Sequence, residues 1–148
     1  YIMDNESNNS QVTLSRSEAR EQAFMLLFSG SFDNEPAEAK IEDDTQLFVC
    51  GVCGYAHSVV SGIEEKQAEL DAEISKYLKK GWTIARISKA SLAILRLAIY
   101  EINYVDSVPE SVSISEAVEL AKKYTIDESK FVNGSLAAYV RRKAGEKQ

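Results

Sequence analysis

The residues with the most obvious chemical potential are two cysteines and a histidine. Cys50, Cys53 and His57 are spaced by three and four positions, so on a helix they would share one face. Three such ligands are conceivable for a metal or redox site, but a structural zinc site takes four ligands. The chain has only 2 Cys and 1 His. We therefore expect no metal and no cofactor, and interpret the pair as small thiols on an apolar face.

Signatures of catalysis are missing from the sequence. It contains no phosphate-binding glycine loop, no nucleophile elbow and no H-E-x-x-H zinc motif. Arg96 and Glu101 do stand in an apolar stretch, where charged groups need partners. They are five residues apart and do not face each other, so each is expected to pair with another helix. The sequence thus favours a protein that is not an enzyme.

Cations and aromatic rings recur together at helical spacing. Arg16, Arg20, Phe24 and Phe28 repeat every four residues; Phe24 is expected in the core, whereas Phe28 is a candidate stacking platform. Lys130 and Phe131 form a similar pair near the end of the chain. Between Ile74 and Tyr100 there is no acidic residue, while the following cations occur: Lys76, Lys79, Lys80, Arg86, Lys89 and Arg96. Rings interleaved with cations suit single-stranded RNA.

The overall charge limits how such a site can work. The chain has 17 Lys and Arg against 23 Asp and Glu, a net charge of −6. A uniformly basic coat for nucleic acid is excluded, but a local basic patch is not. No apolar run reaches the roughly 18 residues of a membrane span, and no signal peptide is apparent. We therefore expect a cytoplasmic protein that does not contact membranes.

The elements that must position these residues are helices. A Ser15–Glu18 capping box predicts a helix from Arg16 to about Ser29. A second helix is expected at about 45–61, with Gly62 as an interruption, and a third at 64–78, with Ala68, Ile74 and Leu78 in the core. A helix at 88–105 is apolar on nearly all sides, so it should be central. Residues 82–87 predict a short turn.

The last two helices complete the expected all-α fold. One is predicted to start at a second capping box, Ser113–Glu116, and the other to be capped by Asp127. We expect residues 1–14 to be disordered, residues 15–143 to form one compact domain of about six or seven helices, and 144–148 to be a frayed basic tail. Tyr1 and Ile2 precede Met3, as residues added for expression would.

Three segments in chain order carry motifs of a known family. Residues 15–23 read S-R-S-E-A-R-E-Q-A and are followed by Leu26-Leu27-Phe28. Residues 93–101 read A-I-L-R-L-A-I-Y-E, and Val108-Pro109 precedes I-S-E-A-V-E-L-A-K at 114–122 and K-F-V-N-G at 130–134. Together they resemble the NusB family of transcription antitermination proteins over roughly residues 15–140.

The resemblance implies a fold, a function and a set of contacts. It implies two packed three-helix bundles and a factor that binds boxA-type single-stranded leader RNA together with NusE, a ribosomal small-subunit protein. The pair would join an antitermination complex on RNA polymerase, chiefly on ribosomal RNA operons. The implied RNA-binding residues are Arg16, Arg20, Phe28, Glu128, Ser129, Lys130 and Phe131, and the implied partner-binding residues are Arg86, Lys89 and Ser91.

Some positions depart from the family's pattern, and other functions stay open. Ser17 and Glu18 replace part of the usual arginine cluster, and Ser91 stands where an acid often meets the partner. RNA affinity of the chain alone is therefore expected to be poor, and dependence on the partner strong. The alternatives are an RNA-binding module of an RNA cytosine methyltransferase, a homodimeric helical interaction protein, and a metal or redox role of Cys50 and Cys53.

The Phe131→Ala substitution tests whether this ring is a stacking residue. If it stacks on a base, RNA binding should weaken by about 1–3 kcal/mol. If the ring instead belongs to the core, the melting temperature should fall while the folded fraction binds RNA normally. Calorimetry and an RNA titration of the same preparation distinguish the two results.

Overall fold

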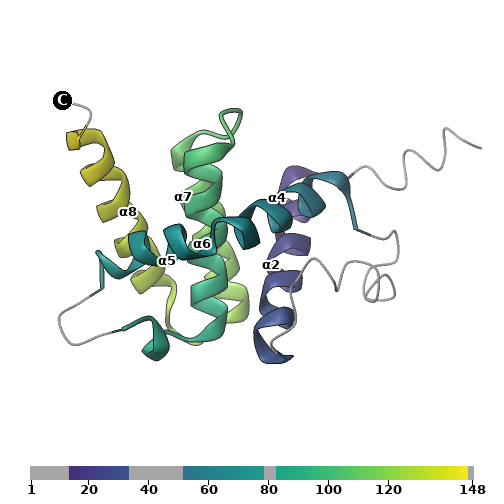
Figure 1. Cartoon of the computed structure of the whole chain (residues 1–148), viewed down its shortest axis with the longest axis horizontal. Helices are drawn as coiled ribbons and strands as arrows, with labels where there is room; N and C mark the ends of the chain where they lie inside the picture. The colour runs from purple at the N-terminus through teal and green to yellow at the C-terminus, as the bar shows by residue number, and fades with distance from the viewer. Residues whose placement is uncertain (1–13, 34–51, 79–82, 147–148) are drawn as a thin grey trace, which may run out of the picture. The chain divides into compact units, whose positions relative to one another are not determined.

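The computed structural model describes residues 14–33, 52–78 and 83–146, and within these ranges the regular elements are all helices. The all-α prediction is therefore confirmed (Figure 1). The chain divides into two compact units, residues 1–64 and 65–148, a boundary in the last turn of one helix. Each unit is described separately below.

The first unit contains helix α2 (Arg16–Asp33) and helix α4 (Gly54–Glu65). The predicted capping box is confirmed, because the Ser15 amide donates to Glu18 Oε1 at 2.9 Å and the Glu18 amide donates to Ser15 Oγ at 3.1 Å. Helix α2 continues four residues beyond the predicted end. Gly30 is buried within it, so packing outweighs the roughly 1 kcal/mol preference against glycine in a helix.

Helix α4 starts later and ends later than predicted. Residues 52 and 53 precede it, residues 45–51 lie outside the described ranges, and Gly62 does not interrupt it. Val59, Val60 and Ile63 are buried around that glycine, so the helix is held by its apolar face. A polar contact joins α2 to the residue just before α4: the Cys53 amide donates to Gln22 Oε1 at 3.0 Å.

The second unit begins with a short helix and a turn. Helix α5 (Gln67–Ser75) follows a break at Lys66, and it buries Leu70 and Ile74. The prediction that Ala68 is a core residue is wrong, because it lies on the exposed face; Leu78 is half-buried. The 3₁₀ turn η2 (Ile84–Arg86) confirms the predicted connection, although Gly81 and Trp82 lie outside the described ranges.

Helix α6 (Lys89–Tyr104) is the central helix of this unit, as predicted. It packs against α5, α7 (Glu110–Tyr124) and α8 (Ser129–Glu146), and Figure 1 shows these helices side by side. The residues buried on it are Ala90, Ser91, Ala93, Ile94, Leu95, Leu97, Ala98, Ile99, Glu101 and Ile102. Burying each large aliphatic side chain stabilises the fold by about 1.5–3 kcal/mol.

Two predicted helix starts are wrong. Helix α7 begins directly after Pro109, whose fixed φ suits a helix entry, so Ser113 lies inside the helix and caps nothing. Its side chain is 1% exposed and faces α6. Helix α8 begins after Glu128, whose carbonyl accepts from the Val132 amide at 3.0 Å. Asp127 lies one residue earlier with φ 60°, in the left-handed region, so it forms the turn and not the cap.

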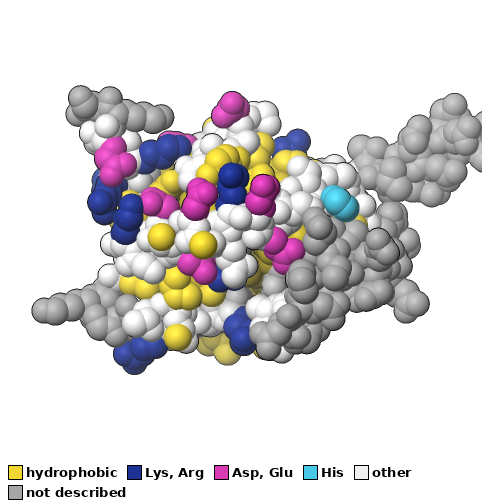
Figure 2. Space-filling model, in the orientation of Figure 1, with side chains coloured by type: hydrophobic (Ala, Val, Ile, Leu, Met, Phe, Trp, Pro, Cys, Tyr) yellow, Lys and Arg dark blue, Asp and Glu magenta, His cyan; other side chains and the backbone are white. Residues whose placement is uncertain are grey.

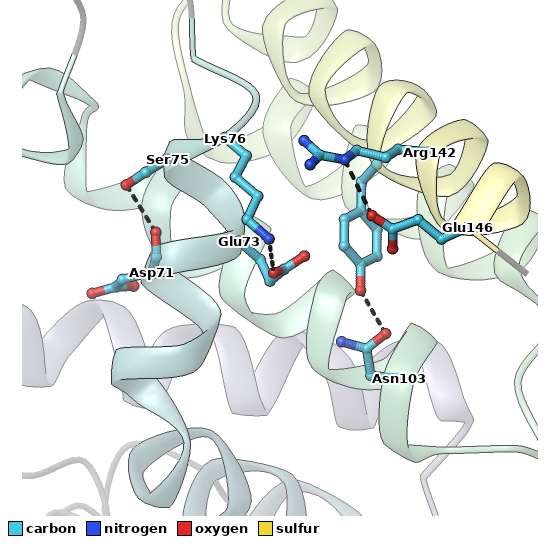
Figure 3. A network of polar contacts seen from close by, with 8 residues as sticks. Asp71, Glu73, Ser75, Lys76, Asn103, Arg142 and Glu146 are labelled. Carbon is cyan, nitrogen blue, oxygen red and sulfur yellow. Dashed lines mark hydrogen bonds and ion pairs between the residues drawn. The ribbon is translucent and has the colours of Figure 1, made fainter.

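Helix α8 reaches further than expected towards the end of the chain. Val132, Leu136 and Tyr139 are buried as predicted, whereas Val140 is half-buried. Residues 144–146, predicted to be part of a frayed tail, belong to the helix. The Arg142 Nε atom lies 3.3 Å from Glu146 Oε2, an i,i+4 pair that supports this last turn (Figure 3).

The two charged side chains in the interior of α6 each bind a neighbouring helix. Arg96 donates from Nε and Nη2 to the two carboxylate oxygens of Asp71 on α5, both at 2.8 Å. Glu101, 1% exposed, accepts from Ser113 Oγ of α7 at 3.2 Å. These contacts confirm the prediction that Arg96 and Glu101 pair with other helices. A charged group in such a position needs a partner, so the pairs specify how α5 and α7 pack on α6.

Both ends of α6 are joined to α8. Near its C-terminal end, Asn103 Oδ1 accepts from Tyr139 Oη at 2.6 Å (Figure 3). At its N-terminal end, Ser88 caps the helix by accepting from the Ser91 amide at 3.1 Å. The hydroxyls of Ser88 and Ser91 both donate to Oε1 of Glu128, the first of them at 2.7 Å.

The Glu128 carboxylate therefore connects the starts of two helices. It lies against the positive end of the α6 dipole, where an anion is stabilised. Because Glu128 itself directly precedes α8, its two hydrogen bonds hold the first turn of α8 against the first turn of α6. Hydrogen bonds to a charged group contribute about 1.5–3 kcal/mol.

Removing the Tyr139 hydroxyl should change how stability depends on pH. Burial raises the pKa of Tyr139 above its ordinary value of 10.0, and the nearby charge of Glu73 acts in the same direction. The folded state therefore resists deprotonation, so this residue's contribution is complete below pH 10 and is lost as pH rises through the raised pKa. Tyr139→Phe should cost about 1 kcal/mol at pH 7. Urea unfolding from pH 7 to 11 should show a shallower decline for the variant; parallel curves would contradict this.

Removing the Glu128 carboxylate should destabilise the second unit. Glu128→Ala is expected to lower the free energy of unfolding by about 2 kcal/mol, because two hydroxyls lose their acceptor. Glu119→Ala is a matched control, since Glu119 is exposed and makes only a loose ion pair with Lys122 at 3.6 Å; it should change stability by less than about 0.5 kcal/mol. Equal unfolding midpoints for the two variants in urea would rule out the role assigned to Glu128.

Candidate nucleic-acid interface

Arg16 and Arg20, predicted to contact RNA from α2, differ in exposure. Arg16 is exposed, and its guanidinium lies 3.8 Å from the centre of the Tyr55 ring, which orients it on the first unit's surface. Arg20 is only 3% exposed. A phosphate contact requires an accessible guanidinium, so the structure supports Arg16 as a candidate and assigns Arg20 to the interior.

The aromatic residues of α2 form a stack that ends in a ring missed by the sequence analysis. Phe24 is fully buried, and Phe28 stacks on it with ring centres 5.4 Å apart and an angle of 12°. Phe28 is half-buried, and Phe32 meets it edge-on at 4.9 Å. Phe32 is 61% exposed. The accessible ring of the stack is therefore Phe32, and continuation of the four-residue repeat was the signal that could have identified it.

The segment leading into α8 divides into structural and accessible residues. Glu128, predicted to bind RNA, is occupied by the hydroxyls of Ser88 and Ser91. Ser129 and Phe131 are half-buried, and Lys130 is exposed. Among the described residues Lys130 forms no ion pair, so its ammonium group is available to a phosphate. The structure thus leaves Lys130 and Phe131 as the accessible cation and ring of this segment.

The residues predicted to bind the partner also differ in exposure. Arg86 in η2 and Lys89 in the first turn of α6 are both exposed. Ser91 is 0% exposed, because its hydroxyl points at Glu128. A contact between Ser91 and a partner is therefore not supported by its position. The S-x-x-S spacing of Ser88 and Ser91 before an apolar helix was the sequence signal of this cap.

The acid-free stretch does not form a continuous basic surface in the described part. Lys76 pairs with Glu73 at 2.7 Å, and Arg96 is bound to Asp71 (Figure 3 shows the first pair). Lys79 and Lys80 lie outside the described ranges. Over α5 and α8, Figure 2 shows acidic side chains interspersed with basic ones. In the described part of this stretch, Arg86 and Lys89 are the exposed cations outside these two ion pairs.

Helices α7 and α8 line an open groove of about 590 Å³, and Lys130 is one of its lining residues. Its walls combine apolar, hydroxyl and charged groups, from Ser111, Ile114, Ser115, Val118, Glu119 and Lys122 of α7 and Ser129, Lys130 and Asn133 of α8. Of these residues, only Ser129 and Lys130 were predicted from the sequence to belong to a site. The others face the same space because they recur at helical spacing on one side of each helix.

The cysteine–histidine motif is only partly described. Cys53 precedes α4, where its carbonyl accepts from the His57 amide at 3.0 Å, and Cys50 lies outside the described ranges. Cys53 is half-buried and His57 exposed. Within residues 14–33, 52–78 and 83–146, no group of three His, Cys, Asp or Glu side chains is arranged to hold a metal ion. Likewise, none of the described helices is long and apolar enough to cross a membrane.

Comparison with known proteins identifies the family. The model of the NusB family matches residues 17–141. A transcription antitermination protein NusB from Lacticaseibacillus paracasei is 42% identical over 127 residues, covering 85% of this chain and 94% of the relative. The solved structure of T. maritima NusB has a TM-score of 0.78 at 32% identity, covering 87% of this chain and 92% of that one. A chain in a structure titled "Crystal Structure of a Plectonemic RNA Supercoil" has a TM-score of 0.76 at 27% identity, covering 87% and 96%. The chain belongs to the NusB family of transcription antitermination proteins.

Proposed function

We propose that this chain binds boxA-type single-stranded leader RNA as a heterodimer with NusE, a ribosomal small-subunit protein. The heterodimer joins an antitermination complex on RNA polymerase and promotes transcription of ribosomal RNA operons in the cytoplasm. Its action is binding, without catalysis. Family membership supports the proposal, since the curated relatives carry the name of transcription antitermination proteins.

The observation that carries the RNA-binding part is the pairing of Lys130 and Phe131 in the first turn of α8. Lys130 is exposed and forms no ion pair in the described part, and the ring of Phe131, the next residue in the sequence, is half-buried. Lysine can bind a phosphate while the neighbouring ring stacks on a base. The first turn of a helix also favours negative charge, which adds to the attraction for a phosphate.

The first unit contributes its own candidate contacts on α2. Arg16 is exposed and oriented by Tyr55, and Phe32 ends the aromatic stack at the surface. We retain Phe28 as the ring that supports Phe32, and omit Arg20 because its side chain is buried. Phe32 packs edge-on against Phe28, which is itself stacked on the buried Phe24. A ring supported in this way loses less entropy when a base stacks on it.

The partner's role follows from charge. Acidic residues outnumber Lys and Arg by 23 to 17, so phosphate binding by this chain alone should be weak. A basic ribosomal protein would supply the missing cations. Arg86 and Lys89 remain the exposed candidates for the partner surface, whereas Ser91 and Glu128 serve the fold.

Fluorescence anisotropy of a labelled boxA-type leader RNA tests the proposal. The RNA is titrated with this chain alone and with NusE, at two salt concentrations, beside an RNA of scrambled sequence. We expect weak binding by the chain alone and tighter, salt-dependent, sequence-selective binding with the partner. Phe32→Ala should weaken that binding by about 1–3 kcal/mol.

The same titration has outcomes that contradict the proposal. Equal affinity for the boxA-type and scrambled RNA, with and without NusE, would exclude a boxA-reading factor. Light scattering of the same samples then tests one alternative, a homodimeric interaction protein. That protein would scatter as a dimer, and adding RNA would not dissociate it.

A further inference from the structure

The groove between α7 and α8 is a solvent-open depression lined by apolar, hydrogen-bonding and charged groups. Its volume of about 590 Å³ lies within the range of about 300–1,000 Å³ found for small-molecule pockets. Ile114 and Val118 are half-buried one turn apart on α7 and provide an apolar surface. The flat face of a nucleic-acid base can cover such a surface.

Neutral hydrogen-bonding groups surround this apolar surface. They comprise hydroxyls on both helices and one carboxamide, from Ser111, Ser115, Ser129 and Asn133. A carboxamide both donates and accepts, as the edges of bases require, and hydroxyls can bind a ribose 2′-hydroxyl. This set is suited to a nucleotide, whereas a purely apolar helix would leave most of these groups without partners.

The charges of the groove favour a phosphate at two places. Lys122 comes from the last turn of α7 and Lys130 from the first turn of α8. Lys122 lies 3.6 Å from Glu119, but these side chains are 61% and 67% exposed, so the pair is weak and can exchange for a phosphate. Glu119 is the one acid among the residues that line the groove, and it should oppose an anionic ligand.

We propose that the α7–α8 groove binds one nucleotide of single-stranded RNA. The base lies on Ile114 and Val118, and the two flanking phosphates bind Lys122 and Lys130. This inference rests on the proposed function and deepens it, because Lys130 would be shared between the groove and the stacking ring Phe131. The RNA would thus continue from the start of α8 along α7, over residues that the sequence analysis did not select.

Two adjacent lysines on α7 give a matched test. Lys122 lines the groove, whereas Lys123 does not and lies 5.5 Å from the centre of the Tyr124 ring. With NusE and the labelled boxA-type RNA, Lys122→Ala should weaken binding about three- to tenfold, and Lys123→Ala should weaken it less than twofold. A plot of log affinity against log salt concentration has a negative slope. For Lys122→Ala this slope should become shallower by about 0.7, the value for one lost phosphate contact on a single strand.

A variant of opposite sign separates binding from damage to the fold. Glu119→Gln removes the acid from the groove, so it should tighten RNA binding about two- to fivefold, which a misfolded protein cannot do. If wild type binds RNA selectively but Lys122→Ala and Lys123→Ala behave alike, the groove proposal is wrong and the proposed function stands. If wild type fails to bind with NusE, both are wrong. If Lys122→Ala weakens NusE binding without RNA, the groove takes a protein partner instead.

Discussion

The second unit is organised by the burial of α6. Most sides of this helix are covered, so the polar groups that it buries must be satisfied by neighbouring elements. Arg96 binds α5, Glu101 binds α7, and Asn103 binds α8. Apolar packing supplies most of the stabilisation, but it tolerates many relative positions of the helices. Because these polar contacts are directional and few, they select one arrangement among those that would bury the same apolar surface.

The same requirement determines which residues are free to bind ligands. Ser91 lies at the buried start of α6, and Glu128 meets its hydroxyl. Ser91 is thereby removed from the surface on which the family resemblance had suggested it, whereas Glu128 is half-buried and uses one carboxylate oxygen, Oε1, for both hydrogen bonds. The hydrogen bonds to Glu128 also hold the first turn of α8 in place, and that turn carries the exposed Lys130 and the half-buried Phe131. A rigid attachment of this kind reduces the entropy lost when a ligand is bound.

The excess of 23 acidic residues over 17 cations implies a particular mode of RNA recognition. Long-range attraction is weak, so affinity has to come from short-range contacts: stacking, hydrogen bonds and a small number of phosphate contacts. The groove between α7 and α8 and the stack ending at Phe32 offer contacts of this type. A basic partner would then add the electrostatic part. Selectivity for one RNA would follow from the short-range contacts of this chain, and dependence on a partner would follow from the electrostatic attraction that the partner supplies.

Several features of this protein could be derived from the sequence alone because they depend on local chemistry. Helical periodicity, the Ser15–Glu18 cap and the apolar character of residues 88–105 each depend on neighbours within a few positions. The need for partners of Arg96 and Glu101 also followed from burial, although their identity did not. Family motifs indicated the function and a first set of site residues.

Only the tertiary structure decided which candidates are accessible. Arg20 and Ser91 are buried, and Glu128 is bound by residues about 40 positions away in sequence. Ser113 resembles a cap in sequence but faces Glu101, since Pro109 starts the helix earlier. The groove exists only because α7 packs on α8. Exposure and long-range pairing depend on which helices meet, and that information is not contained in the spacing of residues along one helix.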